Sequence, residues 1–362
     1  MSRVSVLKFA AGTFARPEAY REIAGVLTRR VDAGDKVAVV VGARPGETER
    51  LRDDAYAVDP APGAAALDGL VQHAGTVSAA LLRVACERRG LFATVLAGRG
   101  TGFVSDSTFG NARLLGYGGR EMSAALARYD VIVVAGGQAT DVTGRPTYLG
   151  EHTADLSAVA VAVGLGADRV EICSDVPGVY DADPNLLAGA RPLAALDYDS
   201  ALRLASLGAR VLHPRAVRLA RARGVTIECR LNREPYPVGT TIGAGGSLPY
   251  AVVVAGDAVV VRCPDPDALT RAADALTARG VEPLLLPHDL VVAVPGGATG
   301  VAPILAAAGA PGRVTGEKLL SVIRDGQVVT TVEPALEAAV RRGQQLLDAR
   351  PATLAEPLLV AA

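Results

Sequence analysis

The chain has 362 residues, more than a single hydrophobic core usually supports, so two domains are expected. Its composition, 50% hydrophobic and 21% charged, is ordinary for a compact soluble protein. A net charge of −1 gives no basic field for a polyanion or an acidic membrane, so we expect no nucleic-acid binding and no membrane association. Neither a secretion signal nor a long apolar run is present, which favours the cytoplasm.

The cysteines are widely spaced and form neither a CxxC pair nor a metal-binding cluster: Cys86, Cys173, Cys229 and Cys263. We expect them to be buried free thiols in a reducing compartment, and we predict no metal held by the protein's own side chains.

Apolar runs of strand length alternate with stretches of helix length from the first residues onward. The expected strands are 4–9, 37–41, 93–96, 131–134, 169–173 and 226–230, and the expected helices are 17–33, 77–89, 153–165, 198–207 and 214–223. Such Val- and Ile-rich runs between helices are typical of parallel strands that are buried on both faces. We therefore predict a three-layer α/β domain in which a mostly parallel sheet lies between helices.

The apolar rhythm ends in the Gly-rich stretch from Gly239 to Ser247, which we interpret as a linker. Beyond it we expect strands at 258–262, 283–286, 290–294 and 318–324, and helices at 266–279, 299–308 and 334–347. The β-α-β-β-α-β order is that of a smaller ferredoxin-like α+β domain. The predicted domains are residues 1–246 and 247–362, with a tail from residue 349.

Lys8 lies near the end of the first predicted strand, before a loop of small residues and a helix that begins near Pro17. Such a junction presents backbone N–H groups and a helix dipole to an anion, and lysine adds a compact positive charge for a phosphate. Small residues after a first strand are also ordinary turn chemistry. Lysine is rare in this chain, however, because Lys8, Lys36 and Lys318 are the only three.

A second candidate segment, 174–184, follows the strand predicted at 169–173 and combines three aspartates with a Gly turn. The carboxyl ends of parallel strands are where open α/β sheets bind ligands. A solvated Asp-rich loop is an equally good interpretation of its spacing.

Two further segments carry charge next to predicted helices. In the segment 208–215 a cationic group such as Arg210 could meet a phosphate, whereas His213 is better explained as a structural histidine. Asp155 opens the apolar helix at 153–165, a position that the helix dipole favours in any protein. From these residues alone, the chain is an α/β protein that binds a nucleotide or a small anion.

Taken together, the segments resemble the aspartate kinase family of the amino acid kinase superfamily over nearly all of residues 1–246. The matching segments follow the family's order: 8–18, 77–82, 105–113, 147–158, 174–184 and 205–215. The C-terminal unit resembles that family's ACT regulatory domains, which implies a regulatory or assembly role and a homodimer.

The resemblance implies transfer of the ATP γ-phosphoryl group, with Mg²⁺, to the carboxylate of an amino-acid-like substrate, aspartate by default. Such catalysis depends mostly on positioning and charge neutralisation. Lys8 would offset charge on the transferred group, Asp155 would organise the lysine, and Arg210 stands where the family has lysine. The residues implied to bind the nucleotide are Gly12, Ser174, Asp175, Gly178, Tyr180 and Asp183, and those implied to face the substrate are Thr48, Gly137 and Glu151.

The chain departs from the family pattern around the reacting centre. Ala10 and Ala11 replace glycines of the phosphate loop, and Glu151 stands where the family places an arginine that grips the substrate carboxylate. Two alternatives to an aspartate kinase therefore stay open. One is a non-catalytic homologue with a regulatory or assembly role, and the other is a kinase that acts on a different carboxylate substrate.

Overall fold

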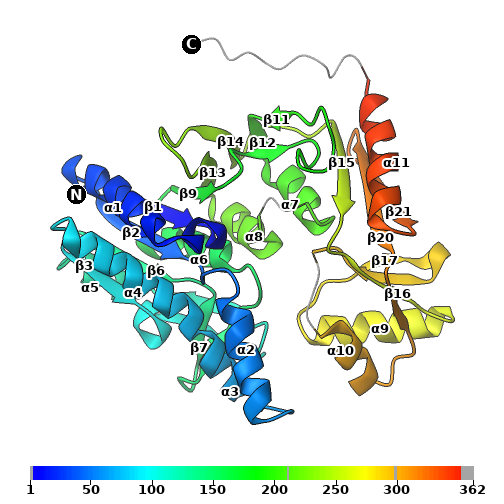
Figure 1. Cartoon of the computed structure of the whole chain (residues 1–362), viewed down its shortest axis with the longest axis horizontal. Coiled ribbons are helices and arrows are strands. Elements are labelled where there is room, and N and C mark those ends of the chain that lie inside the picture. The colour runs from blue at the N-terminus through cyan, green and yellow to red at the C-terminus, as the bar shows by residue number, and fades with distance from the viewer. Residues whose placement is uncertain (1–2, 210–211, 297–299, 352–362) are drawn as a thin grey trace. The chain divides into compact units, whose positions relative to one another are not determined.

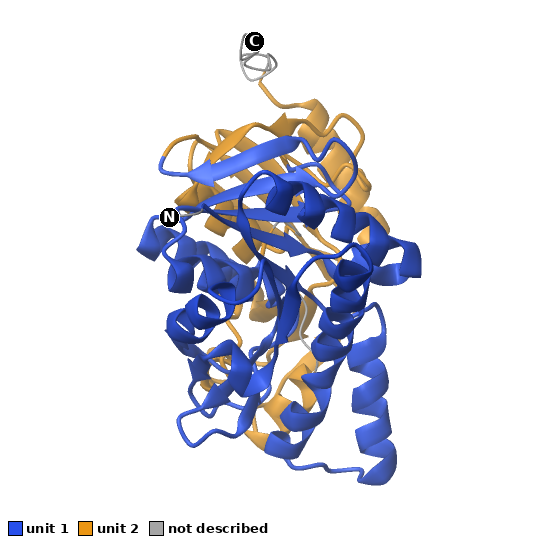
Figure 2. Cartoon of the chain, turned by 90° about the vertical axis from the view of Figure 1, so that its left-hand side faces the viewer, with its two compact units in different colours: residues 1–178, 213–244 blue, residues 179–212, 245–362 orange. Residues whose placement is uncertain are grey.

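The computed structural model describes residues 3–209, 212–296 and 300–351, which divide into two compact units (Figure 2). The first unit comprises residues 1–178 and 213–244, and the second comprises 179–212 and 245–362. Segment 179–212 therefore groups with the C-terminal part of the chain, while the boundary expected between residues 246 and 247 stays a prediction.

The first unit is built on a sheet whose strands follow the order β14-β13-β9-β1-β2-β6-β3 (Figure 1). The bounds are β1 Val4–Phe9, β2 Lys36–Val41, β3 Ala93–Leu96, β6 Val131–Ala135, β9 Arg169–Ser174, β13 Thr226–Leu231 and β14 Val238–Gly243. All neighbouring pairs are parallel except β13 with β14. The parallel sheet predicted from the Val-rich runs is thus confirmed.

Helices cover both faces of this sheet. On one face α1 (Pro17–Asp32) packs against α4 (His73–Arg88), and on the other α6 (Ala154–Leu165) packs against β1, β2 and β9 and contacts α5 (Gly119–Leu126) and α8 (Pro214–Arg223). Leu7 and Phe9 belong to the α1–α4 core, and their complete burial contributes roughly 1.5–3 kcal/mol each. Because side chains alternate along a strand, Lys8 points to the opposite face, toward α6.

Smaller elements of the first unit surround the carboxyl ends of these strands. The short 3₁₀ helix η1 (Ala11–Ala15) follows β1, and α2 (Glu47–Val58) and α3 (Ala64–Val71) follow β2. A side sheet has the order β5-β4-β7-β8, with bounds β4 Phe103–Ser105, β5 Leu114–Tyr117, β7 Gln138–Asp141 and β8 Pro146–Tyr148; the 3₁₀ helix η2 (Gly98–Thr101) precedes β4.

The linker predicted from Gly239 to Ser247 is wrong in its first half, because residues up to Gly243 belong to β14. There Thr240 and Ile242 are buried and the strand pairs with β13. Glycine lowers strand propensity, but the ladder of backbone hydrogen bonds with β13 outweighs that preference here.

In the second unit, one sheet has the order β17-β18-β16-β19, with bounds β16 Val259–Arg262, β17 Leu284–Leu286, β18 Val291–Val294 and β19 Arg313–Thr315. With α9 (Pro266–Ala278) and α10 (Val301–Ala307) it forms the expected ferredoxin-like unit. The 3₁₀ helix η3 (Pro287–Asp289) joins β17 to β18.

The strand predicted at 318–324 exists but was assigned to the wrong sheet. It is β20 (Lys318–Arg324), which pairs with β15 (Tyr250–Ala255) and β21 (Gln327–Glu333), while β19 completes the ferredoxin-like sheet. Helix α11 (Leu336–Asp348) packs on β15 and β20. Segment 179–212 adds β10 (Val179–Tyr180), β11 (Pro192–Leu193), β12 (Ala195–Asp197) and α7 (Tyr198–Ser206) to this unit.

Candidate functional site

A buried ion pair joins Lys8 on β1 to Asp155 in the first turn of α6. The Lys8 Nζ atom lies 2.7 Å from Asp155 Oδ1, and the two side chains are only 10% and 12% exposed. The other carboxylate oxygen accepts a hydrogen bond from the backbone N–H of His213, at 3.3 Å. Each buried charge needs the other, because an isolated charge in the interior is costly. The structure therefore pairs two residues that the motifs singled out separately and that the family resemblance had linked.

The loop after β1 adjoins the end of β9. The Ala10 N–H donates to the carbonyl of Cys173, at 3.1 Å, and the Thr13 N–H donates to the carbonyl of Ala10, at 3.0 Å. A Cβ atom built at Gly12 would have no heavy atom within 4 Å, so open space surrounds this residue. The candidate phosphate loop thus lies at the carboxyl edge of the sheet, beside the segment that begins at Ser174.

Four of the residues expected to bind a nucleotide belong to the first unit: Gly12, described above, and Ser174, Asp175 and Gly178. The Ser174 hydroxyl donates to the carbonyl of Val176, at 2.8 Å, and Asp175 is exposed. Gly178 lies close to β14, where an added Cβ would be 2.5 Å from Thr240 Oγ1 and 2.8 Å from the carbonyl carbon of Gly239. A side chain at residue 178 would therefore displace backbone.

Tyr180 and Asp183 belong to the second unit, where Tyr180 is on β10. The Asp183 carboxylate accepts hydrogen bonds from the N–H and the side-chain amide of Asn185, at 2.9 and 3.1 Å, so it stabilises a local turn. Arg210, the expected third catalytic residue, lies outside the described residues.

Glu151, expected to face the substrate, is paired with a cation that the sequence analysis missed. Its Oε1 atom accepts a hydrogen bond from Arg52 on α2, at 2.6 Å, and its Oε2 atom lies 3.4 Å from the Tyr148 hydroxyl. Burial raises the pKa of Tyr148 and the adjacent Glu151 carboxylate adds to this effect, so the phenol stays protonated as a donor. Arg52 follows Thr48 by four residues, about one helical turn, so the two side chains lie on the same face of α2. This spacing is the sequence signal from which Arg52 could have been predicted.

Thr48 and Gly137 occupy buried positions at the same edge of the first unit. Thr48 lies in the first turn of α2 and is 8% exposed. Gly137 has a φ of +79°, its N–H donates to Ser157 Oγ at 2.9 Å, and its carbonyl accepts from the Leu149 N–H at 2.9 Å. These bonds fix the segment that carries Glu151 relative to α6.

Two further residues hold the loops in place and were not predicted. Arg215 on α8 donates to the carbonyl of Leu149, at 2.7 Å, and to Asn111 Oδ1, at 3.0 Å. The Asp68 carboxylate, 2% exposed, accepts hydrogen bonds from the N–H groups of Tyr148 and Gly110, at 2.8 and 3.0 Å. Burial raises the pKa of Asp68, although both backbone N–H bonds oppose that shift.

The described thiols are not suited to nucleophilic catalysis. All four cysteines are buried and free, as predicted, and burial raises the pKa of Cys86, Cys173 and Cys229 to about 12. Thiolate, the reactive form, is therefore rare at neutral pH. In the described ranges, no three or more His, Cys, Asp or Glu side chains are grouped to hold a metal ion.

A sheet enclosed by helices, with a lysine and an aspartate paired at its carboxyl edge, defines a class of α/β proteins suited to handling phosphates. The model of the amino acid kinase family matches residues 3–231, so this chain belongs to that family. Curated relatives that it matches include aspartokinases, which confirms the resemblance inferred from the motifs.

The aspartokinase of Bacillus sp. (strain MGA3) is 35% identical over 251 residues, covering 69% of this chain and 61% of the relative. That of Helicobacter pylori (strain ATCC 700392 / 26695) is 36% identical over 239 residues, covering 66% and 59%. The chain therefore spans about three fifths of the length of the curated relatives it matches.

Two solved structures share the fold. E. coli aspartokinase III, in complex with aspartate and ADP, superimposes with a TM-score of 0.74 at 19% identity, covering 98% of this chain and 100% of that one. Aspartate kinase from Synechocystis gives a TM-score of 0.59 at 27% identity, covering 89% and 60%. Within the described part of the chain, no helix is long and apolar enough to span a membrane.

Proposed function

We propose that this chain transfers the γ-phosphoryl group of ATP to the carboxylate of an amino acid, with aspartate as the first candidate acceptor. The observation that carries the proposal is the buried Lys8–Asp155 pair, which lies where the loops after β1 and β9 meet. The aspartate and ADP held by E. coli aspartokinase III, which has the same fold, support this choice of ligands.

In the proposed reaction an acceptor carboxylate oxygen attacks the γ-phosphorus. The bond from that phosphorus to the bridging oxygen breaks, and ADP leaves with the bond's electron pair. The products are an acyl phosphate and ADP. Lys8 stabilises the charge on the transferred oxygens, and Asp155 keeps the ammonium group oriented.

Mg²⁺ is proposed to enter with the nucleotide. This ion is usually held by substrate phosphates together with one or two carboxylates, and exposed Asp175 beside the phosphate loop is the candidate carboxylate, which departs from the expectation that no side chain of the protein holds a metal. The metal would neutralise charge on the β- and γ-phosphates.

Recognition of the acceptor is assigned to α2 and the loop before α6. The Arg52–Glu151 pair offers one cation and one anion, which suits an acceptor carrying both an ammonium group and a carboxylate. Any amino acid with these two charged groups could be recognised in this way. The proposal therefore includes a kinase whose acceptor is an amino acid other than aspartate.

The test is an acyl-phosphate assay with the whole chain, MgATP and a panel of amino acids that includes aspartate. Lys8→Arg keeps a cation for Asp155 but misplaces it, and should lose at least about 100-fold in kcat/KM. Arg120→Ala, which removes an exposed arginine from α5, is the matched control. No product with any acceptor would contradict the proposal and leave a non-catalytic homologue, and full activity of Lys8→Arg would remove the assignment of Lys8.

The proposal also includes assembly as a homodimer and a cytoplasmic location. Light scattering of the purified chain tests the first, and fractionation of the source cells tests the second.

A further inference from the structure

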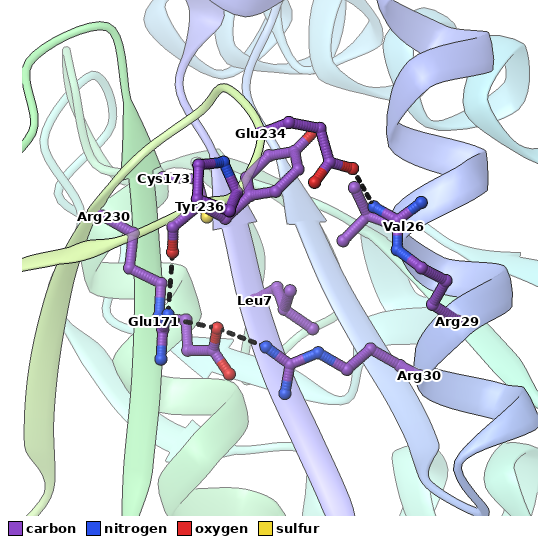
Figure 3. A pocket seen from close by; sticks show the side chains of 10 residues that line it. Leu7, Val26, Arg29, Arg30, Glu171, Cys173, Arg230, Glu234 and Tyr236 are labelled. Carbon is purple, nitrogen blue, oxygen red and sulfur yellow. Dashed lines mark hydrogen bonds and ion pairs between the residues drawn. The ribbon is translucent and has the colours of Figure 1, made fainter.

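Two adjoining cavities open on the α1 face of the first unit, on the side of the sheet opposite to Lys8. They have volumes of 290 and 460 Å³ and share Arg29, Glu234 and Tyr236 in their walls. Leu7 and Cys173 form part of the floor of the smaller one, which Figure 3 shows. Because Leu7 and Lys8 are consecutive on β1, the sheet lies between the smaller cavity and Lys8.

In the smaller cavity every lining arginine is paired with a carboxylate. Glu171, whose side chain is 5% exposed, lies 2.7 Å from Arg30 and 2.9 Å from Arg230, and Arg29 contacts Glu234 (Figure 3). Arg230 also pairs with Glu228 at 2.6 Å. The charges of this cavity are therefore already satisfied, and it has little capacity for an added anion.

The larger cavity differs because it contains two cations in excess. Its lining includes the arginines 16, 29, 89 and 233 but only the glutamates 22 and 234. Arg16 pairs with Glu22 and Arg29 with Glu234, whereas Arg89 and Arg233 make no ion pair or hydrogen bond through their side chains with any described residue. Both residues are exposed, so their guanidinium groups are available to an anion that enters the cavity.

The backbone of α1 makes room for one of these guanidinium groups. Gly25 is buried in the middle of α1, where glycine costs about 1 kcal/mol relative to alanine. A Cβ atom at this position would lie 3.1 Å from Arg89 Nη2. The missing side chain therefore lets the Arg89 guanidinium lie against the helix, at the wall of the cavity.

Neutral hydrogen-bonding groups also line this cavity. The Asn232 side-chain amide donates to the Thr13 hydroxyl, at 2.9 Å, and both residues line the wall. Thr13 belongs to the loop after β1, so an occupant of the cavity would also contact the segment that carries Gly12.

We propose that the larger cavity is a binding site for a small molecule with two or more anionic groups, phosphates or carboxylates, which Arg89 and Arg233 bind directly. Guanidinium groups match both kinds of anion through paired N–H donors. The arginines of this site lie on the face of the sheet opposite to Lys8, and binding there needs no turnover, although Thr13 in the wall belongs to the loop that also carries Gly12.

Titration calorimetry of the whole chain with inorganic pyrophosphate and, separately, with citrate tests the proposal and distinguishes phosphate from carboxylate ligands. Binding of either probe is expected, and Arg89→Ala and Arg233→Ala should each weaken it at least about tenfold. The matched control is Arg88→Ala, which removes the neighbouring exposed arginine of α4 that does not line the cavity. Raising the salt concentration should weaken binding as well.

A second variant distinguishes a loss of ligand binding from a loss of stability. Gly25→Ala should weaken binding by moving Arg89, while the better helix propensity of alanine offsets its effect on stability. Wild-type chain that binds neither probe would overturn the proposal. Binding that survives both arginine substitutions would also overturn it, because the probe would then occupy another site.

Discussion

The guanidinium of Arg52 donates a hydrogen bond to the Glu151 carboxylate over 2.6 Å, which joins α2 to the loop that leads to Asp155. The two side chains are 20% and 33% exposed, so the pair itself contributes only about 1 kcal/mol or less to stability. If it recognises the acceptor, its removal should affect catalysis much more than folding.

Arg52→Ala and Glu151→Ala are each expected to raise the KM for the acceptor at least about tenfold while leaving the KM for ATP within about twofold. Arg50→Ala, which removes the ion pairs of Arg50 with Glu47 and Asp54 on the same helix but leaves the Arg52–Glu151 pair intact, serves as the control and should change neither constant. Equal effects of Arg52→Ala and Arg50→Ala would show that the Arg52–Glu151 pair only stabilises the fold.

The sequence predicted the main sheet because its strands are unbroken apolar runs, but it could not predict the Arg52–Glu151 contact. Helix α2 is polar and largely exposed, so it lacks the apolar periodicity on which helix prediction depends. The strands β4 and β7 were missed for a related reason. They are short, and the partner that stabilises each is distant in the sequence, as in the pairing of Val104 with Thr140.

The candidate site was predictable residue by residue but not as an arrangement. Lys8 was notable for its rarity and Asp155 for its place at a helix N-terminus, yet only the fold shows that they form an ion pair. From the sequence, the helix dipole is a sufficient reason for an aspartate at residue 155. The burial of Lys8 beside it depends on how the sheet and α6 pack, which the sequence pattern does not show.

Breaking the Lys8–Asp155 pair from one side should destabilise the chain strongly. Lys8→Met leaves the Asp155 carboxylate buried without its cation, which typically costs about 3–5 kcal/mol. The double variant Lys8→Met/Asp155→Leu removes both charges and should regain most of that loss. Denaturant titrations of the wild type, the single variant and the double variant measure these differences. Equal stability of the wild type and Lys8→Met would contradict the buried pairing.

Asp141 gives the unfolding free energy a defined dependence on pH. Its carboxylate accepts hydrogen bonds from the Thr143 hydroxyl, at 2.7 Å, and from the Arg145 side chain, at 2.8 Å, and these bonds lower its pKa below the ordinary 3.8. A depressed pKa in the folded state contributes stability that is fully present above the unfolded pKa and is lost as the pH falls toward the folded value.

The wild type should therefore lose more stability than Asp141→Asn between about pH 5 and about pH 2.5. Denaturant titrations across this range measure the difference. Asp53→Asn, which removes an exposed carboxylate, controls for the loss of one negative charge. Parallel stability profiles for the wild type and Asp141→Asn would show that the hydrogen bonds around Asp141 do not favour its ionised form.

Gly178 and Gly12, both expected to lie beside the nucleotide, differ in the space around them. At residue 178 a Cβ would lie within 2.8 Å of the Gly239 backbone, so β14 or the loop after β9 must move, whereas at Gly12 it would meet nothing within 4 Å.

Gly178→Ala should therefore cost about 1–3 kcal/mol of unfolding free energy and weaken ATP binding. Gly12→Ala should change the unfolding free energy by less than about 0.5 kcal/mol, so any loss of ATP affinity in that variant reports on the approach of phosphate to the loop. Denaturant titration and calorimetry with MgATP measure both quantities, and equal destabilisation by the two substitutions would contradict the close approach of Gly178 to β14.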